Sequence, residues 1–266
     1  MEYSIEYFCV SHKGNLRSTN QDNFYCLNEY MPSDNNGSDG VINGVARSMD
    51  TPVFAVFDGM GGEECGEVAA YIAAKQISEC KFEHTSHLEL LQYCKIANDE
   101  ICKYTAENSL VSMGTTAAIL MFAKKNILLC NIGDSKIFRF TDGALQQISY
   151  DHVSISAFGT KPPLTQNLGI KEDELIISPY TATGEYHNHD IYLICSDGLT
   201  DMVSNEDIGN ILNSSQKENS ADLLLQKALE NGGKDNITLI LLYISKDNKN
   251  IVKRIIESLR YRHGKN

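Results

Sequence analysis

Short, nearly continuous runs of apolar residues recur along the chain and predict buried β-strands. Such runs are typical of strands that are covered on both faces, or of strands at the centre of a sandwich. They cover residues 4–10, 53–57, 117–123, 127–132, 136–140, 191–195 and 237–244. The polar stretch PSDNNGSDG at 32–40 instead predicts a solvated loop.

Other segments repeat their apolar residues at helical spacing. One stripe consists of Ala69, Ile72, Ala73, Ile77 and Cys80, and the next of Leu90, Cys94, Ala97, Ile101 and Tyr104. Each stripe predicts one amphipathic helix, and the loop between them, around 82–86, indicates an antiparallel helix pair lying on a sheet. A shorter stripe near the end of the sequence, Val252, Ile255, Ile256 and Leu259, predicts a further helix.

The order of these elements indicates the fold class. The predicted helices are grouped and do not alternate with the strands, which favours an α+β layered sandwich over a doubly wound parallel sheet. We expect one domain over residues 1–245, followed by a basic helix over 246–266. That helix offers a surface to an acidic partner or an anionic membrane, but its short apolar face favours packing on the domain.

Charge is unevenly distributed along the sequence. The net charge is −12, and residues 246–266 contribute +5, so residues 1–245 carry −17. An acidic body argues against nucleic acid as a partner, because binding a phosphate backbone needs a basic surface. Clustered acids can instead hold cations.

The cysteines and the hydropathy indicate the cellular setting. The chain has 8 cysteines, none of them in a CxxC pair, so zinc and thioredoxin-type sites lack support. No apolar stretch approaches the length of a membrane span, and MEYSIEYF does not resemble a signal peptide. We therefore expect a cytoplasmic, monomeric protein with reduced thiols and no transmembrane segment.

Asp58 is the first candidate for chemistry. It follows the apolar run at 53–57 and opens the sequence DGMGG. Glycine allows close approach of the backbone, so the Gly59 carbonyl can also bind a cation. The helix predicted next directs its N-terminus toward this turn, where phosphate is favoured. Taken alone, an ordinary strand-to-helix turn explains the pattern equally well.

Further aspartates stand at the edges of other apolar runs. They are Asp22 in NQD, Asp134 in IGDS, Asp197 in SDG and Asp235 in GGKDN. A single Asp-Gly turn means little, but sheet assembly brings strand ends together and can gather such acids at one site. Ligation by oxygen alone selects Mg²⁺ or Mn²⁺ over zinc.

Neighbouring residues extend this site or compete with it. Arg17 lies five residues before Asp22, and arginine binds phosphate bidentately. Asp151 and His152 either support the site from behind or serve structure alone, and we favour structure. No cysteine is followed by arginine six residues later, and DxDx[TV] is absent, which excludes cysteine-based and aspartyl-phosphate phosphatases.

Together these motifs resemble one family. They are GNLRSTNQD (14–22), FDGMGG (57–62), MGTT (113–116), NIGDSKIFR (131–139), DH (151–152), SDGLTD (196–201) and GGKDNITL (232–239). In kind and order they are similar to those of the metal-dependent serine/threonine phosphatases of type 2C, the PPM family, in their bacterial form. The resemblance covers nearly all of residues 1–245.

The resemblance implies a fold and a catalytic centre. The fold would be an αββα four-layer sandwich, two antiparallel sheets flanked by helix pairs. Asp58 would bridge two Mn²⁺ or Mg²⁺ ions, Asp197 and Asp235 would hold one ion, and the Gly59 carbonyl and Asp22 the other.

The resemblance also implies a third ion in bacterial members, held by Asp134 and Asp197. Arg17 would bind the phosphate. A hydroxide shared by two ions would hydrolyse phosphoserine and phosphothreonine in proteins without a phosphoenzyme. The substrates would be proteins phosphorylated by a cognate serine/threonine kinase.

Three positions depart from the family pattern. Gln21 is neutral where many members carry Glu, and Met60 and Glu63 stand where human-type and bacterial members, respectively, carry a histidine. These departures support an alternative from another class, a catalytically silent pseudophosphatase that binds phosphoproteins.

Overall fold

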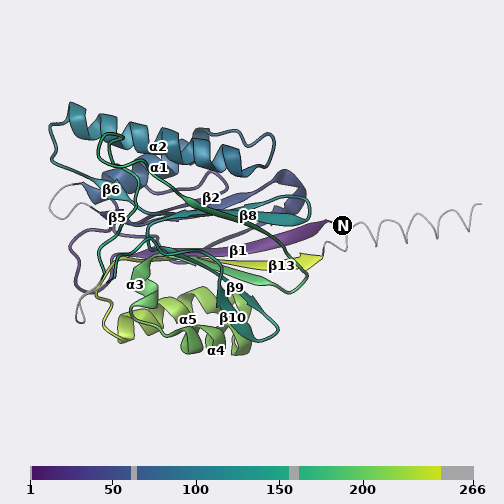
Figure 1. Cartoon of the computed structure of the whole chain (residues 1–266). Coiled ribbons are helices and arrows are strands. Elements are labelled where there is room, and N and C mark those ends of the chain that lie inside the picture. Colours follow the sequence, from purple (N-terminus) through teal and green to yellow (C-terminus); the bar gives the residue numbers. More distant parts are fainter. Residues whose placement is uncertain (1, 61–64, 156–161, 247–266) are drawn as a thin grey trace, which may run out of the picture.

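The computed structural model describes residues 2–60, 65–155 and 162–246, and within them it confirms the four-layer sandwich (Figure 1). Two antiparallel sheets face each other, and helices cover the outer face of each. The predicted basic helix at 246–266 lies almost wholly outside the described residues, so it and the boundary at residue 245 stay predictions.

One sheet has six strands in the order β10-β9-β12-β13-β1-β3. In chain order the strands are β1 (Tyr3–His12), β3 (Ile42–Arg47), β9 (Lys136–Thr141), β10 (Ala144–Gln147), β12 (Ile191–Cys195) and β13 (Ile237–Lys246). Every neighbouring pair is antiparallel. The first and last of these strands, β1 and β13, therefore lie side by side inside the sheet.

The second sheet has five strands in the order β11-β8-β7-β4-β2, again antiparallel throughout. Its strands are β2 (Asn23–Cys26), β4 (Val53–Phe57), β7 (Ala117–Phe122), β8 (Asn126–Ile132) and β11 (Tyr180–Glu185). Two very short strands, β5 (Gly59–Met60) and β6 (Gly114–Thr115), form a separate pair. In the chain, β5 follows β4 and β6 precedes β7.

Five helices form the outer layers of the described structure. The pair α1 (Gly66–Glu79) and α2 (His87–Glu107) packs on the five-stranded sheet, and α3 (Asp197–Thr200), α4 (Asn205–Ser214) and α5 (Lys217–Glu230) pack on the six-stranded sheet. The loop predicted around 82–86 does separate α1 from α2. Ser86 and Glu89 close the start of α2 with a capping box, which satisfies backbone donors that would otherwise lack partners.

Three apolar cores hold the layers together. Between the sheets, aromatic side chains such as Phe54, Phe122 and Tyr192 pack edge to face. A second core, rich in small residues of α1, joins α1 and α2 to the five-stranded sheet, and a third joins α3–α5 to the other sheet. Burial of each large apolar side chain contributes roughly 1.5–3 kcal/mol, so these cores fix the strand ends firmly.

Strand prediction succeeded where strands are buried and failed at the edges. The apolar runs at β4, β7 and β12 form fully buried strands. No pattern in the sequence predicted β2, β3 or β11. Strand β2 is only four residues long, and β3 and β11 alternate partly buried with exposed residues at the edges of their sheets.

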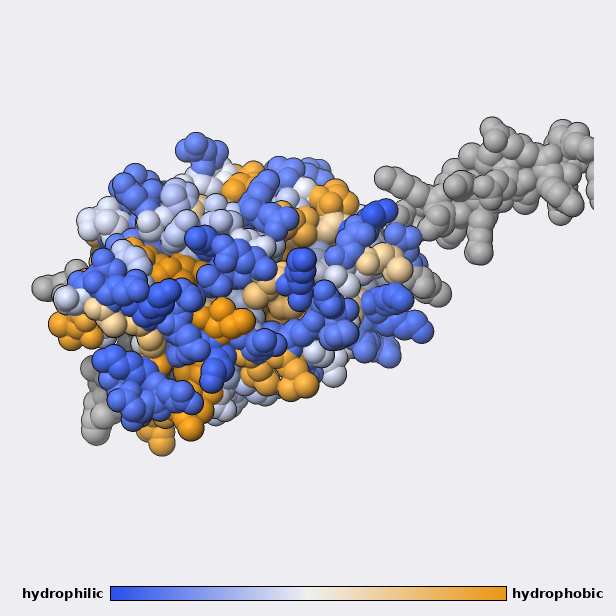
Figure 2. Space-filling model, turned by 90° about the horizontal axis from the view of Figure 1, so that it is seen from above, coloured by the Kyte–Doolittle hydropathy of each residue, from blue (hydrophilic) through white to orange (hydrophobic). Residues whose placement is uncertain are grey.

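The outer surface is mixed in character. Figure 2, which looks onto the molecule from above, shows mostly hydrophilic residues with smaller, separate hydrophobic patches. Among the described residues, no helix combines the length and apolarity that crossing a membrane requires. The loop predicted at 32–40 is confirmed, since it contains only irregular backbone, bends and one isolated bridge, between Gly37 and His12.

Candidate metal centre

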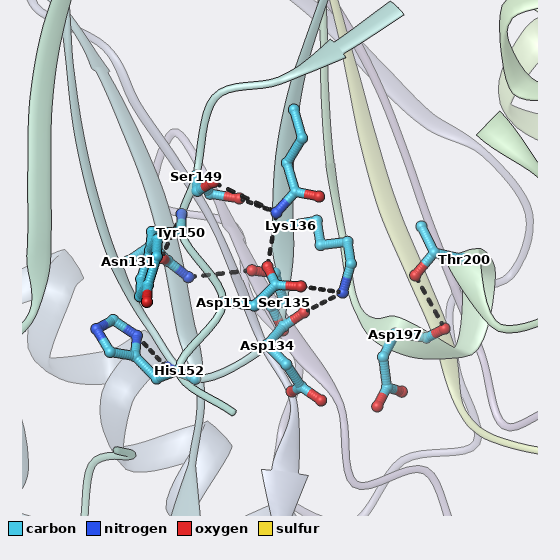
Figure 3. A network of polar contacts seen from close by, with 12 residues as sticks. Asn131, Asp134, Ser135, Lys136, Ser149, Tyr150, Asp151, His152, Asp197 and Thr200 are labelled. Carbon is cyan, nitrogen blue, oxygen red and sulfur yellow. Dashed lines mark hydrogen bonds and ion pairs between the residues drawn. The ribbon is translucent and has the colours of Figure 1, made fainter. Parts of the chain in front are cut away.

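Three carboxylates from three separate turns meet beside the ends of the strands. Asp58 follows β4, Asp134 follows β8, and Asp197 begins α3 just after β12. One carboxylate oxygen of each lies within 4.8 Å of the others. Asp134 and Asp197 are almost fully buried, and Asp58 is half-buried. We call these three residues the carboxylate cluster; Figure 3 shows the Asp134 and Asp197 side chains directed to the same side.

Backbone contacts fix the Asp58 turn. The Asp58 N–H donates to Thr116 Oγ1 at 3.0 Å, and its carbonyl accepts from the Thr115 hydroxyl at 3.0 Å. A Cβ atom at Gly59 would lie 2.3 Å from the carbonyl oxygens of Gln21 and Gly66. The turn therefore needs glycine, and it packs against the start of α1 as the sequence predicts.

The same threonine also reaches the Asp134 turn. The hydroxyls of Thr116 and Ser135 are 2.6 Å apart. Gly133 has a φ of +98°, and a Cβ atom there would lie 2.5 Å from the Thr116 side chain. The buried residue Thr116 thus connects two turns of the carboxylate cluster through its hydroxyl, a role beyond packing that the MGTT motif alone does not reveal.

Asp22 is buried deeply beside this cluster. Its Oδ2 accepts a 2.7 Å hydrogen bond from the Ser196 hydroxyl, while Oδ1 is buried without a hydrogen-bond partner among the described residues. Burial raises the pKa of Asp22 to about 7, against the opposing effect of the Ser196 hydrogen bond. A buried carboxylate oxygen of this kind fits a site that a cation completes.

Arg17 and Asp235 form an ion pair at the outer side of the centre. Arg17 Nη2 lies 2.7 Å from Asp235 Oδ2, and the two side chains are 51% and 32% exposed. Asp235 is also close to the cluster, because its Cβ lies 3.4 Å from the position a Cβ of Gly198 would take. We refer to Arg17 and Asp235 as the outer ion pair.

Asn236 is a residue whose role sequence reasoning missed. Its side chain accepts from the Gln21 N–H at 2.8 Å and donates to the carbonyls of Lys13 and Thr19 at 2.9 Å. It thereby fastens the loop that carries Arg17 to the turn before β13. Its place directly after Asp235 was the only available signal.

The predicted site residues therefore fall into distinct groups. Asp58, Asp134 and Asp197 converge, and Gly59 directly follows Asp58 in the chain. Asp22 and Asp235 lie outside the group of three, and each contacts a protein side chain. Glu63 lies outside the described residues.

Two other residues behave largely as expected. Cys195 is fully buried, and burial raises the pKa of its thiol to about 12, as predicted for an inert cysteine. The His152 N–H donates to the Gly133 carbonyl at 2.9 Å, and His152 Nδ1 accepts from the Gly133 N–H at 3.3 Å. His152 thereby supports the Asp134 turn.

The donor set fits a divalent metal. Carboxylate oxygens gathered at one place repel each other, and cations such as Mg²⁺ and Mn²⁺ prefer oxygen ligands of this kind. The buried Oδ1 of Asp22 is an independent sign of the same fit.

Comparisons with known proteins agree with this geometry. The family model described as protein phosphatase 2C matches residues 43–231. The serine/threonine phosphatase stp of Listeria welshimeri is 30% identical over 226 residues, which cover 75% of this chain and 87% of that protein.

Solved structures are similar over nearly the whole chain. The serine/threonine phosphatase PstP/Ppp of Mycobacterium tuberculosis superposes with a TM-score of 0.75 at 26% identity, covering 91% of this chain and 100% of that one. The catalytic domain of PstP in complex with two manganese ions gives a TM-score of 0.73 at 27% identity, with 92% and 100% covered. The chain belongs to the protein phosphatase 2C family, whose members are metal-dependent serine/threonine protein phosphatases.

Proposed function

We propose that this chain removes phosphate from phosphoserine and phosphothreonine side chains of proteins in a reaction that depends on Mn²⁺ or Mg²⁺. The observation that carries the proposal is the convergence of the carboxylate oxygens of Asp58, Asp134 and Asp197 to within 4.8 Å. A binding module has no need to place three carboxylates against one another, whereas a metal-dependent hydrolase does.

The ligands divide among two or three ions. Asp58 would serve both of the first two ions, Asp197 and Asp235 would hold one of them, and Asp22 with the Gly59 carbonyl would hold the other. Asp134 and Asp197 would hold a third ion. This assignment is supported by the cluster geometry and by the close approach of Asp235 to the Asp197–Gly198 turn.

The ions, when bound, supply Lewis-acid activation of water and positive charge for the phosphoryl oxygens. The chain's own contribution to substrate binding is Arg17, whose guanidinium matches the geometry of a phosphoryl group. In the structure this guanidinium is bound to Asp235. On substrate binding Arg17 would give up its hydrogen bond to Asp235 and donate to phosphate oxygens instead, so that Asp235 would be available as a metal ligand.

In the overall reaction the phosphorus–oxygen bond to the serine or threonine side chain breaks. Water provides the new oxygen on phosphorus, and the leaving side-chain oxygen takes up a proton. On this proposal no protein nucleophile is required, because the ions would activate the attacking water.

The partners follow from the chemistry. The substrates are proteins phosphorylated by a cognate serine/threonine kinase, and the chain acts as a monomer. The relative stp of Listeria and the structural neighbour PstP are both described as serine/threonine phosphatases, which supports this substrate class.

The test is hydrolysis of p-nitrophenyl phosphate and of phosphothreonine peptides by the full chain as Mn²⁺ is added. We expect turnover that requires the metal and is abolished by EDTA. Weak or absent Mn²⁺ binding in calorimetry, together with no turnover, would instead favour the silent phosphoprotein-binding module, for which the neutral Gln21 argues.

A further inference from the structure

Lys136 places a positive charge directly behind the carboxylate cluster. It lies at the start of β9, two residues after Asp134. Its ammonium donates to the backbone carbonyl of Asp134 at 2.9 Å and pairs with Asp151 Oδ2 at 3.0 Å. Figure 3 shows this ammonium on one side of the Asp134 backbone and the Asp134 carboxylate on the other.

Asp151 is itself held from the opposite side. Its Oδ1 accepts a 2.6 Å hydrogen bond from the side-chain amide of Gln147. The same amide lies 3.3 Å from the carbonyl of Ser149, whose hydroxyl accepts from the Ile137 N–H at 2.9 Å. Each oxygen of Asp151 therefore has a set partner, and the carboxylate is fixed in one orientation.

The side chains of Lys136 and Asp151 are only 18% and 26% exposed. Water screens a partly enclosed pair of charges less than an exposed one. Lysine carries its charge on a flexible four-carbon chain, so its ammonium goes to whichever anion attracts it most. The carboxylate cluster and Asp151 are anions close to the base of this side chain.

We propose that Asp151 is a positioning residue that holds the Lys136 ammonium on the Asp134 carbonyl, away from the Asp134 carboxylate. Without this restraint the ammonium competes with a divalent cation for Asp134. The inference rests on the proposed metal-binding role of Asp134.

The Asp151→Asn substitution tests this with little change in shape. An asparagine has one side-chain acceptor, and if that oxygen keeps the Gln147 hydrogen bond, its NH₂ group faces the ammonium. Lys136 is then released. We expect calorimetric Mn²⁺ titration to show about tenfold weaker binding at the site that depends on Asp134, because a local cation opposes metal entry.

The double variant Lys136→Met, Asp151→Asn separates positioning from a purely structural role. Removing the released ammonium should restore Mn²⁺ affinity to within about threefold of that of the unmodified protein. The two substitutions are coupled because they act through the same Lys136–Asp151 ion pair. A double variant as weak as Asp151→Asn, or weaker, would overturn the proposal, because loss of turn geometry would then be the cause. Unchanged Mn²⁺ affinity in Asp151→Asn would overturn it as well.

Two further variants make the outcome specific. Asp50→Asn breaks an exposed ion pair with Arg47, 2.9 Å long, and should leave Mn²⁺ binding unchanged. Asp134→Asn identifies the site itself. If Asp134→Asn does not alter Mn²⁺ binding, both the metal role and this inference fail; if it does and Asp151→Asn does not, only this inference fails. Thermal unfolding of every variant checks that the fold is intact.

Discussion

The carboxylate cluster and the outer ion pair differ in how the negative charge of their aspartates is balanced. In the cluster, Asp58, Asp134 and Asp197 bring like charges within 4.8 Å of one another. In the outer pair, the guanidinium of Arg17 neutralises Asp235 within the protein. An added cation stabilises the cluster. In the outer pair Asp235 already has a cation, the Arg17 guanidinium, which a metal ion would have to replace. Metal binding should therefore depend mainly on the cluster, and phosphate binding on Arg17 of the outer pair.

The strongest test of this difference is removal of one cluster charge. Asp58→Asn and Asp197→Asn should each lower kcat by on the order of 10³-fold, the scale at which loss of one preorganised electrostatic group acts. Steady-state hydrolysis of p-nitrophenyl phosphate measures the effect. Asp142→Asn is a matched control, since this exposed residue has a φ of 51°, which asparagine accepts. Full activity in either cluster variant would contradict the assigned roles.

Metal removal tests the cluster through stability. Mn²⁺ at about 100 times its Kd should stabilise the folded state by about 2.7 kcal/mol, which corresponds to roughly 5–10 °C in Tm for a chain of this size. Differential scanning fluorimetry with EDTA and with Mn²⁺ measures the shift. The Asp197→Asn variant should show a smaller shift, and an equal shift would place the metal elsewhere.

A smaller effect is expected at the outer ion pair. Arg17→Ala removes charge-assisted hydrogen bonds to the substrate, each worth about 1.5–3 kcal/mol, so kcat/KM should fall roughly 10- to 100-fold. Arg17→Lys keeps the charge but loses the bidentate geometry. Its kcat/KM should lie between that of the unmodified protein and that of Arg17→Ala. Mn²⁺ affinity should not weaken in Arg17→Ala. If it weakens while kcat/KM is retained, the division between the two regions is wrong.

The smallest effect is expected from a change at Ser196, whose hydroxyl donates a hydrogen bond to the buried Asp22 carboxylate. Ser196→Ala removes the 2.7 Å hydrogen bond to Asp22 Oδ2 and the acceptor of the Thr238 N–H. Leaving these buried groups unpaired should cost about 1–3 kcal/mol of unfolding free energy in the metal-free protein. Urea unfolding in EDTA and in Mn²⁺ measures it. We expect a smaller loss with metal, because a cation satisfies Asp22, and an equal loss in both conditions would argue against that ligand.

The sequence predicted most of the buried framework. Continuous apolar runs are a direct signature of strands covered on both faces, so β4, β7, β8, β12 and β13 were found. The edge strands β3 and β11 were not, because their residues face solvent in part and their pairing depends on partners far along the chain.

Parts of the candidate site could likewise be predicted from the sequence, and other parts could not. The aspartates at strand ends could be recognised because each stands beside an apolar run. The contact between Arg17 and Asp235 could not, since the residues are separated by 218 positions and meet only in the fold. Thr116 and Asn236 were missed for a related reason, because their side chains act on backbone groups of distant turns.

The pairing of β1 with β13 has a consequence for the order of folding. These strands pair from Tyr3 with Lys246 to His12 with Ile237, so the six-stranded sheet closes only after almost the whole described chain has left the ribosome. Contacts this distant in sequence form slowly, because a long loop must be ordered before they contribute. Asp235 and Asn236 reach the loop of Arg17 in that same closing step. During synthesis, the contact of Arg17 with Asp235 should therefore form only after β13 has emerged.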